Sequence, residues 1–304
     1  MRKLFVGLLF ALSGFVPLQA GYTPKVYEPK LVTFADASAS AVTEVKKGSI
    51  YEGKVVSTYF TGTYMDAKTV ESKLEAAGFE VVASYKPVKK GTTLVFTSTA
   101  LKAEASKAGR GYVAVSRVFV DDKEKMISFT NPVYFGKAFM QDDYTDDAFV
   151  ATLDKINAAF PGLKPSADKL EFDDLADYHF MVGMPYYEDA DELGKSAPTT
   201  ADLVAKAKAY KKGKAVIFDI KLSDTSTLLG YDLGKRTKKF VKKIGRQNAA
   251  ILPWTVLIEN GKATALNAKY YIAISYPLLD MSGFMGIATV PGAITKDLEK
   301  AFKK

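Results

Sequence analysis

The octapeptide KKGTTLVF at residues 89–96 is followed, later in the chain, by a close copy, KKGKAVIF, at residues 211–218. Four further markers come after each copy, in the same order. They are Gly-Arg at 109–110 and 245–246, VFVDD at 118–122 and VLIEN at 256–260, an aromatic triplet expected to form a strand at 133–135 and 270–272, and the Ala-Phe end of a closing helix at 159–160 and 301–302. A fixed order of repeated motifs is the sequence signature of an internal repeat. We therefore predict two related units in tandem.

Within each unit the hydrophobic pattern alternates between helices and strands. In the first unit, Asp66 is placed to cap a helix that Gly78 ends, and a strand is expected at 79–85. In the second, Asn260-Gly261 is the preferred pair for a tight hairpin turn. Hairpins mixed with helices favour antiparallel or mixed sheets covered by helices. The predicted fold class is α+β: two tandem two-layer α/β units, each an antiparallel or mixed sheet with helices on one face.

Five segments organise the chain. Residues 1–20 are predicted to be a signal peptide, 21–49 an N-terminal arm, 50–160 the first α/β unit, 161–165 a linker and 166–304 the second α/β unit. The linker is assigned because its Pro and Gly residues stop the preceding helix.

The first twenty residues predict export. Met1-Arg2-Lys3 is a charged start, and Ala20 is a small residue before the expected cleavage point. The apolar stretch at 4–16 is shorter than the ~20 residues that a membrane-spanning helix needs. These are the features of a secretory signal peptide. We therefore expect a periplasmic or secreted protein, with no membrane span after signal cleavage.

The composition limits the chemistry. The chain has no Cys, which excludes disulfides, thiolate metal sites and a Cys nucleophile. The formal net charge is +8, but residues 142–192 are mainly acidic and residues 195–246 mainly basic. A basic protein raises nucleic acid as a partner, yet an exported protein seldom meets it, so no nucleic-acid partner is expected. Two solvated surfaces of opposite charge are the simpler interpretation.

Several motifs give the two units a resemblance to a known family. In the first unit these are Gly78-Phe79 and, after the hairpin, Asn131-Pro132-Val133-Tyr134 and Ala138-Phe139-Met140. In the second they are ILPWTV at 251–256 and the Asn260-Gly261 turn, while Ala268-Lys269 replaces Asn131-Pro132. Each unit resembles the domain of unknown function 302 family, present here as a tandem duplication with a divergent second copy. The resemblance covers residues 50–160 well and 200–304 loosely. It implies a compact two-layer α/β unit and supplies no catalytic residues.

Signals for catalysis are weak. The chain has one His, His179, and no Gly-x-Ser-x-Gly motif that would nominate a serine nucleophile. Residues 230–237 (GYDLGKRT) contain Gly and Lys, but their spacing does not fit a phosphate-binding loop. We predict no catalytic residues and no organic cofactor. An enzyme that uses carboxylates and tyrosines as acid–base groups stays open as an alternative.

The candidate metal ligands are His179, Met181 and Met184, within the sequence HFMVGM. On a strand, His179 and Met181 would point to the same face. Imidazole and thioether groups suit Cu(I), which prefers soft ligands, and Met281 and Met285 are available as further sulfur ligands. The alternative is that these methionines fill gaps in the core. Copper is therefore the candidate cofactor.

Two other segments stand out. Residues 270–294 are the most apolar stretch after the signal peptide, but their Pro and Gly residues oppose a membrane helix. We predict a buried strand and a hydrophobic loop there, in the core or at an interface. Residues 235–243 are predicted to form a basic, solvated surface helix, with Phe240, Val241 and Ile244 as one narrow apolar stripe. Contact with anionic lipid or an acidic partner is the alternative.

These observations favour a binding protein. We predict a non-enzymatic protein of the cell envelope that binds a small ligand, or an envelope protein, in the groove between its two units, because ligand sites form preferentially where domains meet. A homo-oligomer is compatible with the sequence. The alternatives are a periplasmic copper-binding protein and the carboxylate–tyrosine enzyme.

Overall fold

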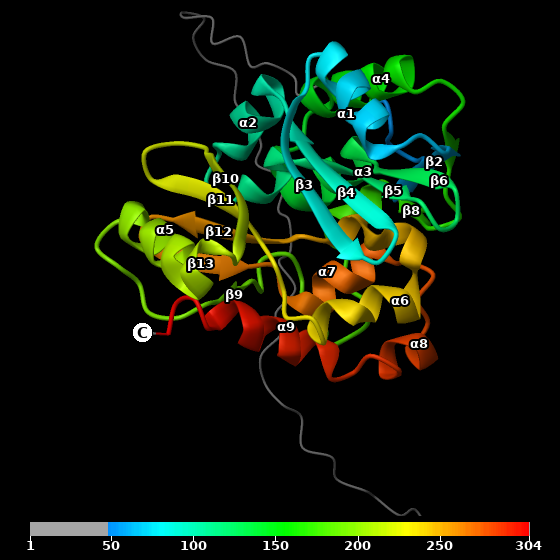
Figure 1. Cartoon of the computed structure of the whole chain (residues 1–304). Helices are drawn as coiled ribbons and strands as arrows, with labels where there is room; N and C mark the ends of the chain where they lie inside the picture. Colours follow the sequence, from blue (N-terminus) through cyan, green and yellow to red (C-terminus); the bar gives the residue numbers. More distant parts are fainter. Residues whose placement is uncertain (1–47, 304) are drawn as a thin grey trace, which may run out of the picture. The chain divides into compact units, whose positions relative to one another are not determined.

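The computed structural model describes residues 48–303. The predicted signal peptide and all but the last two residues of the predicted N-terminal arm lie outside this range. Within it the structure is α+β, with antiparallel sheets packed against helices, which confirms the predicted fold class (Figure 1). No helix of the described range is long and apolar enough to cross a membrane.

The first half of the described chain, here residues 48–175, contains an antiparallel sheet of order β3-β4-β5-β6-β2-β7. Its strands are β2 (Tyr59–Thr63), β3 (Glu80–Val88), β4 (Gly91–Thr97), β5 (Ser116–Asp121), β6 (Met126–Thr130) and β7 (Lys164–Pro165). The helices of this half are α1 (Ala67–Ala76), α2 (Thr99–Ala105), α3 (Pro132–Met140) and α4 (Asp146–Ala159), with 3-10 turns η1 (Gly111–Ala114), η2 (Gln141–Asp143) and η3 (Asp173–Leu175). A separate ribbon pairs β1 (Val55–Ser57) with β8 (Lys169–Glu171).

The second half contains an antiparallel sheet of order β10-β11-β12-β13-β9. Its strands are β9 (Asp191–Glu192), β10 (Val216–Lys221), β11 (Ser226–Tyr231), β12 (Trp254–Glu259) and β13 (Lys262–Ala265). The helices are α5 (Thr200–Ala209), α6 (Val241–Ile244), α7 (Ala268–Ser275), α8 (Met281–Met285) and α9 (Val290–Glu299), with 3-10 turns η4 (Tyr210–Gly213), η5 (Thr237–Phe240) and η6 (Arg246–Ile251).

The two halves share one topology. In the first, the order β3-β4-β5-β6-β2 matches β10-β11-β12-β13-β9 in the second. Each half runs through a first strand, a helix, two strands, a helical connection, a hairpin and closing helices. The Gly-Arg markers lie at the start of the 3-10 turn in both: Gly109-Arg110 directly precedes η1, and Gly245 precedes η6, whose first residue is Arg246. This is the arrangement that the internal repeat predicts.

The opening octapeptides, however, do not lie on equivalent strands. The segment LVF at 94–96 belongs to β4, whereas VIF at 216–218 belongs to β10, whose counterpart is β3. The sequence similarity is therefore displaced by one strand. This displacement explains why the second half is longer between its Lys-Lys-Gly and Gly-Arg markers, because that interval holds both β10 and β11.

The two aromatic triplets are helical, so their prediction as strands is wrong. Residues 133–135 lie in α3 and residues 270–272 in α7. Each helix begins after an asparagine whose side chain accepts a hydrogen bond from a backbone N–H: Asn131 from Val133 and Asn267 from Lys269, both at 3.0 Å. Such a cap satisfies a backbone donor that a helix start leaves unpaired. Both helices are mostly buried, and a helix that is apolar on most sides lacks the 3.6-residue pattern.

The apolar stretch at 270–294 is also helical rather than a strand and a loop. It comprises α7, α8 and the start of α9. Residues of α7 are buried, whereas Leu278, Met281 and Met285 are exposed. The stretch therefore contributes both to the core and to the surface.

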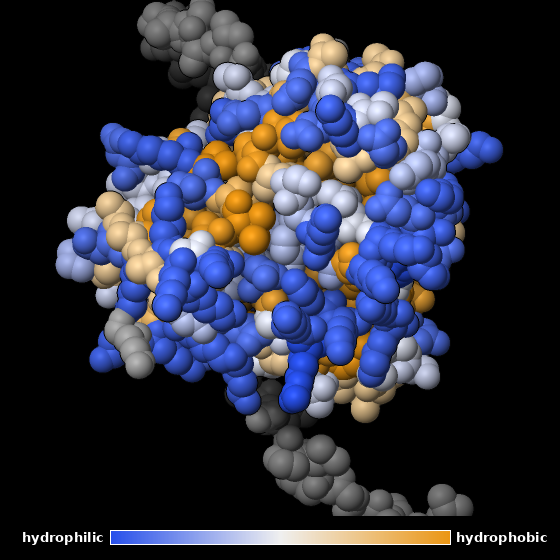
Figure 2. All heavy atoms as spheres, viewed as in Figure 1, coloured by the Kyte–Doolittle hydropathy of each residue, from blue (hydrophilic) through white to orange (hydrophobic). Residues whose placement is uncertain are grey.

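The predicted linker at 161–165 ends α4 as expected, with Gly162 at a φ of +84°. Its last two residues then form β7, which pairs with β2 at the edge of the first sheet. The basic segment forms η5 and α6, in which Phe240 and Val241 are buried and Lys239, Lys242 and Lys243 are exposed. Figure 2 shows this part of the surface as mostly hydrophilic.

The core lies partly inside the first half and partly between the halves. One face of the first sheet packs on α1 and α4 through a cluster that includes Leu74, Phe96 and Ile156. A larger cluster joins residues of both halves, among them Phe119 of β5 and Trp254 of β12. Contacts are reciprocal: η6 packs on β5 and β6, and η1 packs on β11 and β12.

Candidate functional site

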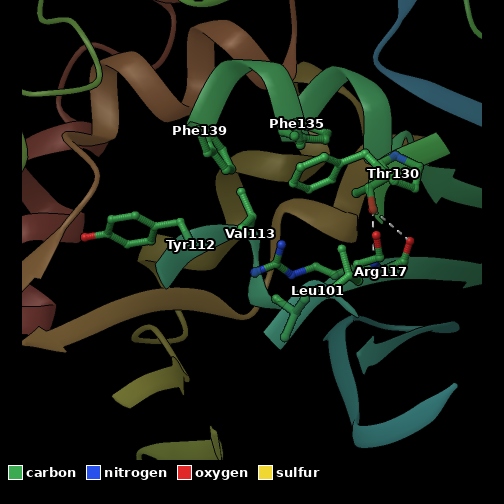
Figure 3. Close-up of a pocket in the computed structure, with 12 residues that line it drawn as sticks. Leu101, Tyr112, Val113, Arg117, Thr130, Phe135 and Phe139 are labelled. Carbon is green, nitrogen blue, oxygen red and sulfur yellow. Dashed lines mark hydrogen bonds between the residues drawn. The ribbon is translucent and has the colours of Figure 1, made fainter. Parts of the chain in front are cut away.

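A small cavity lies within the first half, between α3 and the β5–β6 hairpin (Figure 3). Its volume is about 20 Å³, which is room for about one water molecule. Its walls are mainly aromatic and aliphatic, and the lining residues are Leu101, Tyr112, Val113, Val115, Ser116, Arg117, Thr130, Pro132, Phe135, Gly136, Phe139 and Phe149. Phe135 is half-buried, whereas the other lining residues are buried.

Arg117 is the charged residue of this lining. It is 5% exposed, and its Nε and Nη2 atoms are buried without a hydrogen-bond partner. Its Nη1 atom donates to the hydroxyl of Tyr271, at 3.4 Å, from α7 of the second half. Among the ion pairs of residues 48–303, none includes Arg117. The guanidinium is thus buried without a protein counter-charge.

The backbone around Arg117 is held in place by the hairpin. Its backbone N–H donates to the Thr130 hydroxyl at 2.9 Å, and that hydroxyl donates to the Arg117 carbonyl at 3.2 Å. Both residues lie on neighbouring strands, β5 and β6 (Figure 3). The backbone of Arg117 is therefore fixed, and the surrounding lining residues limit the positions that its guanidinium can occupy.

A buried charge of this kind is costly. Moving an ionised group out of water is strongly unfavourable unless it is paired and hydrogen-bonded, and even an unpaired neutral donor costs about 1–3 kcal/mol. Arg remains protonated in proteins, so it cannot relieve the cost by losing its proton. A small anion or a water molecule beside Nε and Nη2 would relieve it.

The aromatic residues around the cavity form a connected group. Phe139 contacts Phe135, Tyr187 and Tyr271, with ring centroids 5.5–5.9 Å apart. In Figure 3, Phe135 and Phe139 extend from α3 toward the side of the cavity where Arg117 lies. The lining is therefore mostly apolar around one cationic group, which is the composition of a small-ligand site.

The ionisation of Tyr271 is suppressed. Burial raises the pKa of its hydroxyl, while the neighbouring Arg117 acts in the opposite direction. Burial also raises the pKa of Tyr112 well above its usual value. Both tyrosines are therefore neutral near pH 7, and neither supplies a negative charge to the guanidinium.

A second arginine shows how the same edge of a guanidinium behaves when it has a partner. Arg246 uses its Nε and Nη2 atoms to bind the two carboxylate oxygens of Asp121, at 2.9 and 2.7 Å. Its Nη2 atom also donates to the carbonyls of Lys89 and Lys90. The atoms that are unpaired in Arg117 are thus the ones that grip a carboxylate in Arg246.

The repeat supplies an internal comparison for Arg117. The hairpins end at the pairs Asp121–Met126 and Glu259–Lys262, so Arg117 on β5 corresponds to Thr255 on β12. Thr255 is buried and uncharged. Because the same strand position accepts a neutral residue in the second half, the topology itself does not require an arginine there.

The predicted metal residues lie elsewhere. His179, Met181 and Met184 lie in a stretch of turns between β8 and β9, so the expectation of a strand is wrong. Gly183, with a φ of +82°, explains the turn, since this backbone conformation favours glycine. The His179 ring lies against Tyr186, with centroids 4.4 Å apart. No group of three or more His, Cys, Asp or Glu side chains in the described range is arranged to hold a metal ion.

Sequence reasoning missed Arg117. The signal was present, because an arginine stands in SRVFVD, a strand that is otherwise apolar apart from its ends, at a position where the repeat has threonine. What the sequence did not show is that α3 and η1 close over this residue. That closure depends on helix α3, for whose start the sequence pattern predicts a strand.

Comparison with protein-family models, with curated proteins and with solved structures finds no match to this chain. The resemblance to the domain of unknown function 302 family stays a prediction.

Proposed function

We propose that this protein binds a small anion, without catalysing a reaction on it, in the cavity at Arg117. The observation that carries the proposal is a guanidinium that is 5% exposed and has two unpaired nitrogen atoms. An anion beside these atoms would supply the missing counter-charge and two hydrogen bonds, and hydrogen bonds between charged groups are stronger than neutral ones.

The tyrosines near the cavity support binding rather than catalysis. A tyrosine that acts as a base at neutral pH needs a lowered pKa. Burial instead raises the pKa of Tyr112, Tyr271 and Tyr187. These hydroxyls are suited to donate hydrogen bonds, and not to remove protons.

The proposed site differs from the groove between the two units that the duplication suggested. The lining residues come from residues 101–149, in the first half. The second half contributes Tyr271, which contacts the guanidinium from outside the lining. The proposal therefore places the ligand inside one half, with the other half holding the arginine in position.

Thermal unfolding in salts tests the proposal. The chain from residue 21 is compared with Arg117→Met in sodium formate, nitrate, chloride and sulfate at constant ionic strength. A ligand of the folded state raises Tm as its concentration increases, so at least one anion should raise Tm in the wild type and not in Arg117→Met. Lys221→Met removes the same charge from an exposed position and is the control.

The variant also separates binding from a structural role. Replacing a buried charge by an apolar side chain of similar size is often neutral or stabilising. We therefore expect Arg117→Met, without added anion, to be at least as stable as the wild type. An equal anion response in both proteins would refute the proposed function.

We also propose that the protein is exported. The support for export is the sequence of residues 1–20, which lies outside the described residues. We expect the chain to be recovered from the periplasm or the medium with Gly21 as its first residue. Amino-terminal sequencing of the purified protein tests this directly. Recovery in the cytoplasm with Met1 retained would contradict it.

Copper binding is a second candidate, favoured by one contact. The rings of Phe180 and Phe284 stack with centroids 4.9 Å apart, which brings the turn with Met181 and Met184 next to helix α8. Met181, and Met281 and Met285 of α8, are all exposed. Thioether sulfurs on neighbouring segments are suitable ligands for Cu(I).

Mass spectrometry after Cu(I) titration tests the second candidate. The wild type should retain one copper ion, and the triple variant His179→Leu, Met181→Leu, Met184→Leu should retain none. Met65→Leu with Met126→Leu changes methionines elsewhere in the chain and is the control. Unchanged uptake in the triple variant would remove the hypothesis.

A further inference from the structure

The unpaired atoms of Arg117 have a defined geometry. Nε–H and one N–H of Nη2 lie on the same edge of the planar guanidinium and point in parallel directions. This edge forms two parallel hydrogen bonds with an anion that presents two oxygens in a plane. The other nitrogen, Nη1, is engaged by the Tyr271 hydroxyl. The free part of the group is therefore a fork, and not a diffuse charge.

The pair Arg246–Asp121 provides the precedent within the same molecule. There the Nε and Nη2 edge binds a carboxylate through both oxygens, at 2.9 and 2.7 Å. Asp121 is fully buried, whereas the Arg246 side chain is 16% exposed, so this pair forms in a setting that is only partly removed from water. A planar oxyanion at Arg117 would repeat this arrangement with a ligand in place of the aspartate.

The cavity restricts the size of the anion. A volume of about 20 Å³ holds about one water molecule, so an anion of three or more heavy atoms needs movement of the walls, and a tetrahedral anion with four oxygens needs more of it than a flat one. A planar anion places its atoms in a thin layer beside the guanidinium. Phe135 is the half-buried lining residue, so we expect its ring to be the part of the wall that moves aside.

We propose that the ligand of the Arg117 cavity is a small planar oxyanion, of the carboxylate, nitrate or bicarbonate type, held by the Nε and Nη2 atoms. This inference rests on the proposed function, since it names the ligand class of the same site. Tyr271 is a positioning residue, because its hydroxyl fixes Nη1 and so orients the opposite edge of the guanidinium. The apolar rings exclude water from the pair, which strengthens the interaction.

Calorimetric titration of the chain from residue 21 tests separately whether any anion binds at Arg117 and whether planar anions are preferred. The probes are sodium formate, nitrate and bicarbonate, which are planar, then chloride, which is spherical, and sulfate, which is tetrahedral. We expect binding of a planar probe at one equivalent, about tenfold or more tighter than chloride or sulfate, because only the planar probe makes two parallel bonds.

Arg117→Lys is the decisive variant, since it keeps the positive charge and loses the fork. Its affinity for the planar probe should fall about tenfold or more, while Lys221→Met leaves the affinity unchanged. Retained affinity in Arg117→Lys, or a preference for chloride or sulfate, would overturn the planar-anion inference and leave anion binding standing. If no probe binds the wild type more tightly than Arg117→Met, only water occupies the cavity and both proposals fail.

Discussion

Tyr134 and Tyr270 make the same hydrogen bond in opposite directions across the two halves of the molecule. The Tyr134 hydroxyl donates to the carbonyl of Ile274 at 2.8 Å, and the Tyr270 hydroxyl donates to the carbonyl of Ala138 at 3.3 Å. Each tyrosine is the third residue after the asparagine that caps its helix. Each acceptor carbonyl lies on the opposite helix, four residues after the tyrosine of that helix. Reciprocal contacts of this kind characterise two-fold dimers. The halves therefore meet as two subunits of a symmetric dimer do.

Removing either hydroxyl should have a similar and moderate effect. A typical intramolecular hydrogen bond contributes about 1 kcal/mol to stability, so Tyr134→Phe and Tyr270→Phe should each lower the free energy of unfolding by about 1 kcal/mol. Urea unfolding measures it. Tyr186→Phe, at an exposed position, is the control and should leave stability unchanged. A large loss of stability in one variant and none in the other would show that the two hydrogen bonds do not contribute equally to the free energy of unfolding.

The ion pair between Arg246 and Asp121 should matter more. Asp121 is fully buried, and Arg246 binds both of its oxygens from the other half. Removing one partner of a buried pair leaves an uncompensated charge and costs about 3–5 kcal/mol. We expect Arg246→Met to lower the free energy of unfolding by about 3 kcal/mol, toward the lower limit because the arginine is partly exposed.

A double variant separates the pair from its surroundings. Asp121→Asn combined with Arg246→Met removes both charges, so it should cost less than Arg246→Met alone plus Asp121→Asn alone. Urea unfolding of the four proteins gives the coupling. The matched surface pair is Lys221–Asp224, where Lys221→Met should leave stability nearly unchanged, because both side chains are exposed to solvent. If the stability losses of Arg246→Met and Asp121→Asn simply add in the double variant, the two side chains do not form a buried ion pair.

The two halves should unfold together. Residues 48–303 lie in one compact unit, and one core cluster contains residues of both halves. Gly111 of η1 approaches β12 so closely that a Cβ there would lie 2.3 Å from the Leu257 side chain. We expect a single calorimetric transition for the chain from residue 48, with residues 48–165 alone failing to give a cooperative one. Two separate transitions would instead favour the independent units of the sequence prediction.

The features that sequence predicted well are those with local signals. The cap at Asp66 is present, with its side chain accepting from the Thr69 N–H. The hairpin turn at Asn260-Gly261 has both residues at positive φ, as that pair predicts. The α+β class followed from such elements. Each of them is determined by a few neighbouring residues, so no knowledge of tertiary contacts was needed.

The features that sequence did not predict depend on distant contacts. Helices α3 and α7 are enclosed by both halves, and their apolar composition resembles that of a buried strand. Arg117 becomes a candidate ligand group only because Phe139 and Tyr271, from separate helices, remove it from water. The copper hypothesis at His179 rests on residues adjacent in sequence, whereas the burial of Arg117 depends on residues that are distant in sequence.

Alkaline pH should unfold the protein through its buried tyrosines. Burial raises the pKa of Tyr59, Tyr134, Tyr270 and Tyr276 well above 10, and that of Tyr178 to about 12. A raised pKa in the folded state means that the unfolded chain loses the proton first. Stability is therefore unaffected below about pH 10 and falls above it, by about 1.4 kcal/mol per pH unit for each such tyrosine. Phenolate absorbance and circular dichroism should change together.

Tyr59→Phe isolates this effect from hydrogen bonding. The Tyr59 hydroxyl is fully buried and has no hydrogen-bond partner, so its removal takes away an ionisable group without breaking a bond. We expect Tyr59→Phe to be at least as stable as the wild type at pH 7 and to unfold at a higher pH. An unchanged midpoint of alkaline unfolding would mean that Tyr59 is not a group whose ionisation opens the core. A loss of stability at pH 7 would mean that its hydroxyl has a partner, such as a buried water molecule.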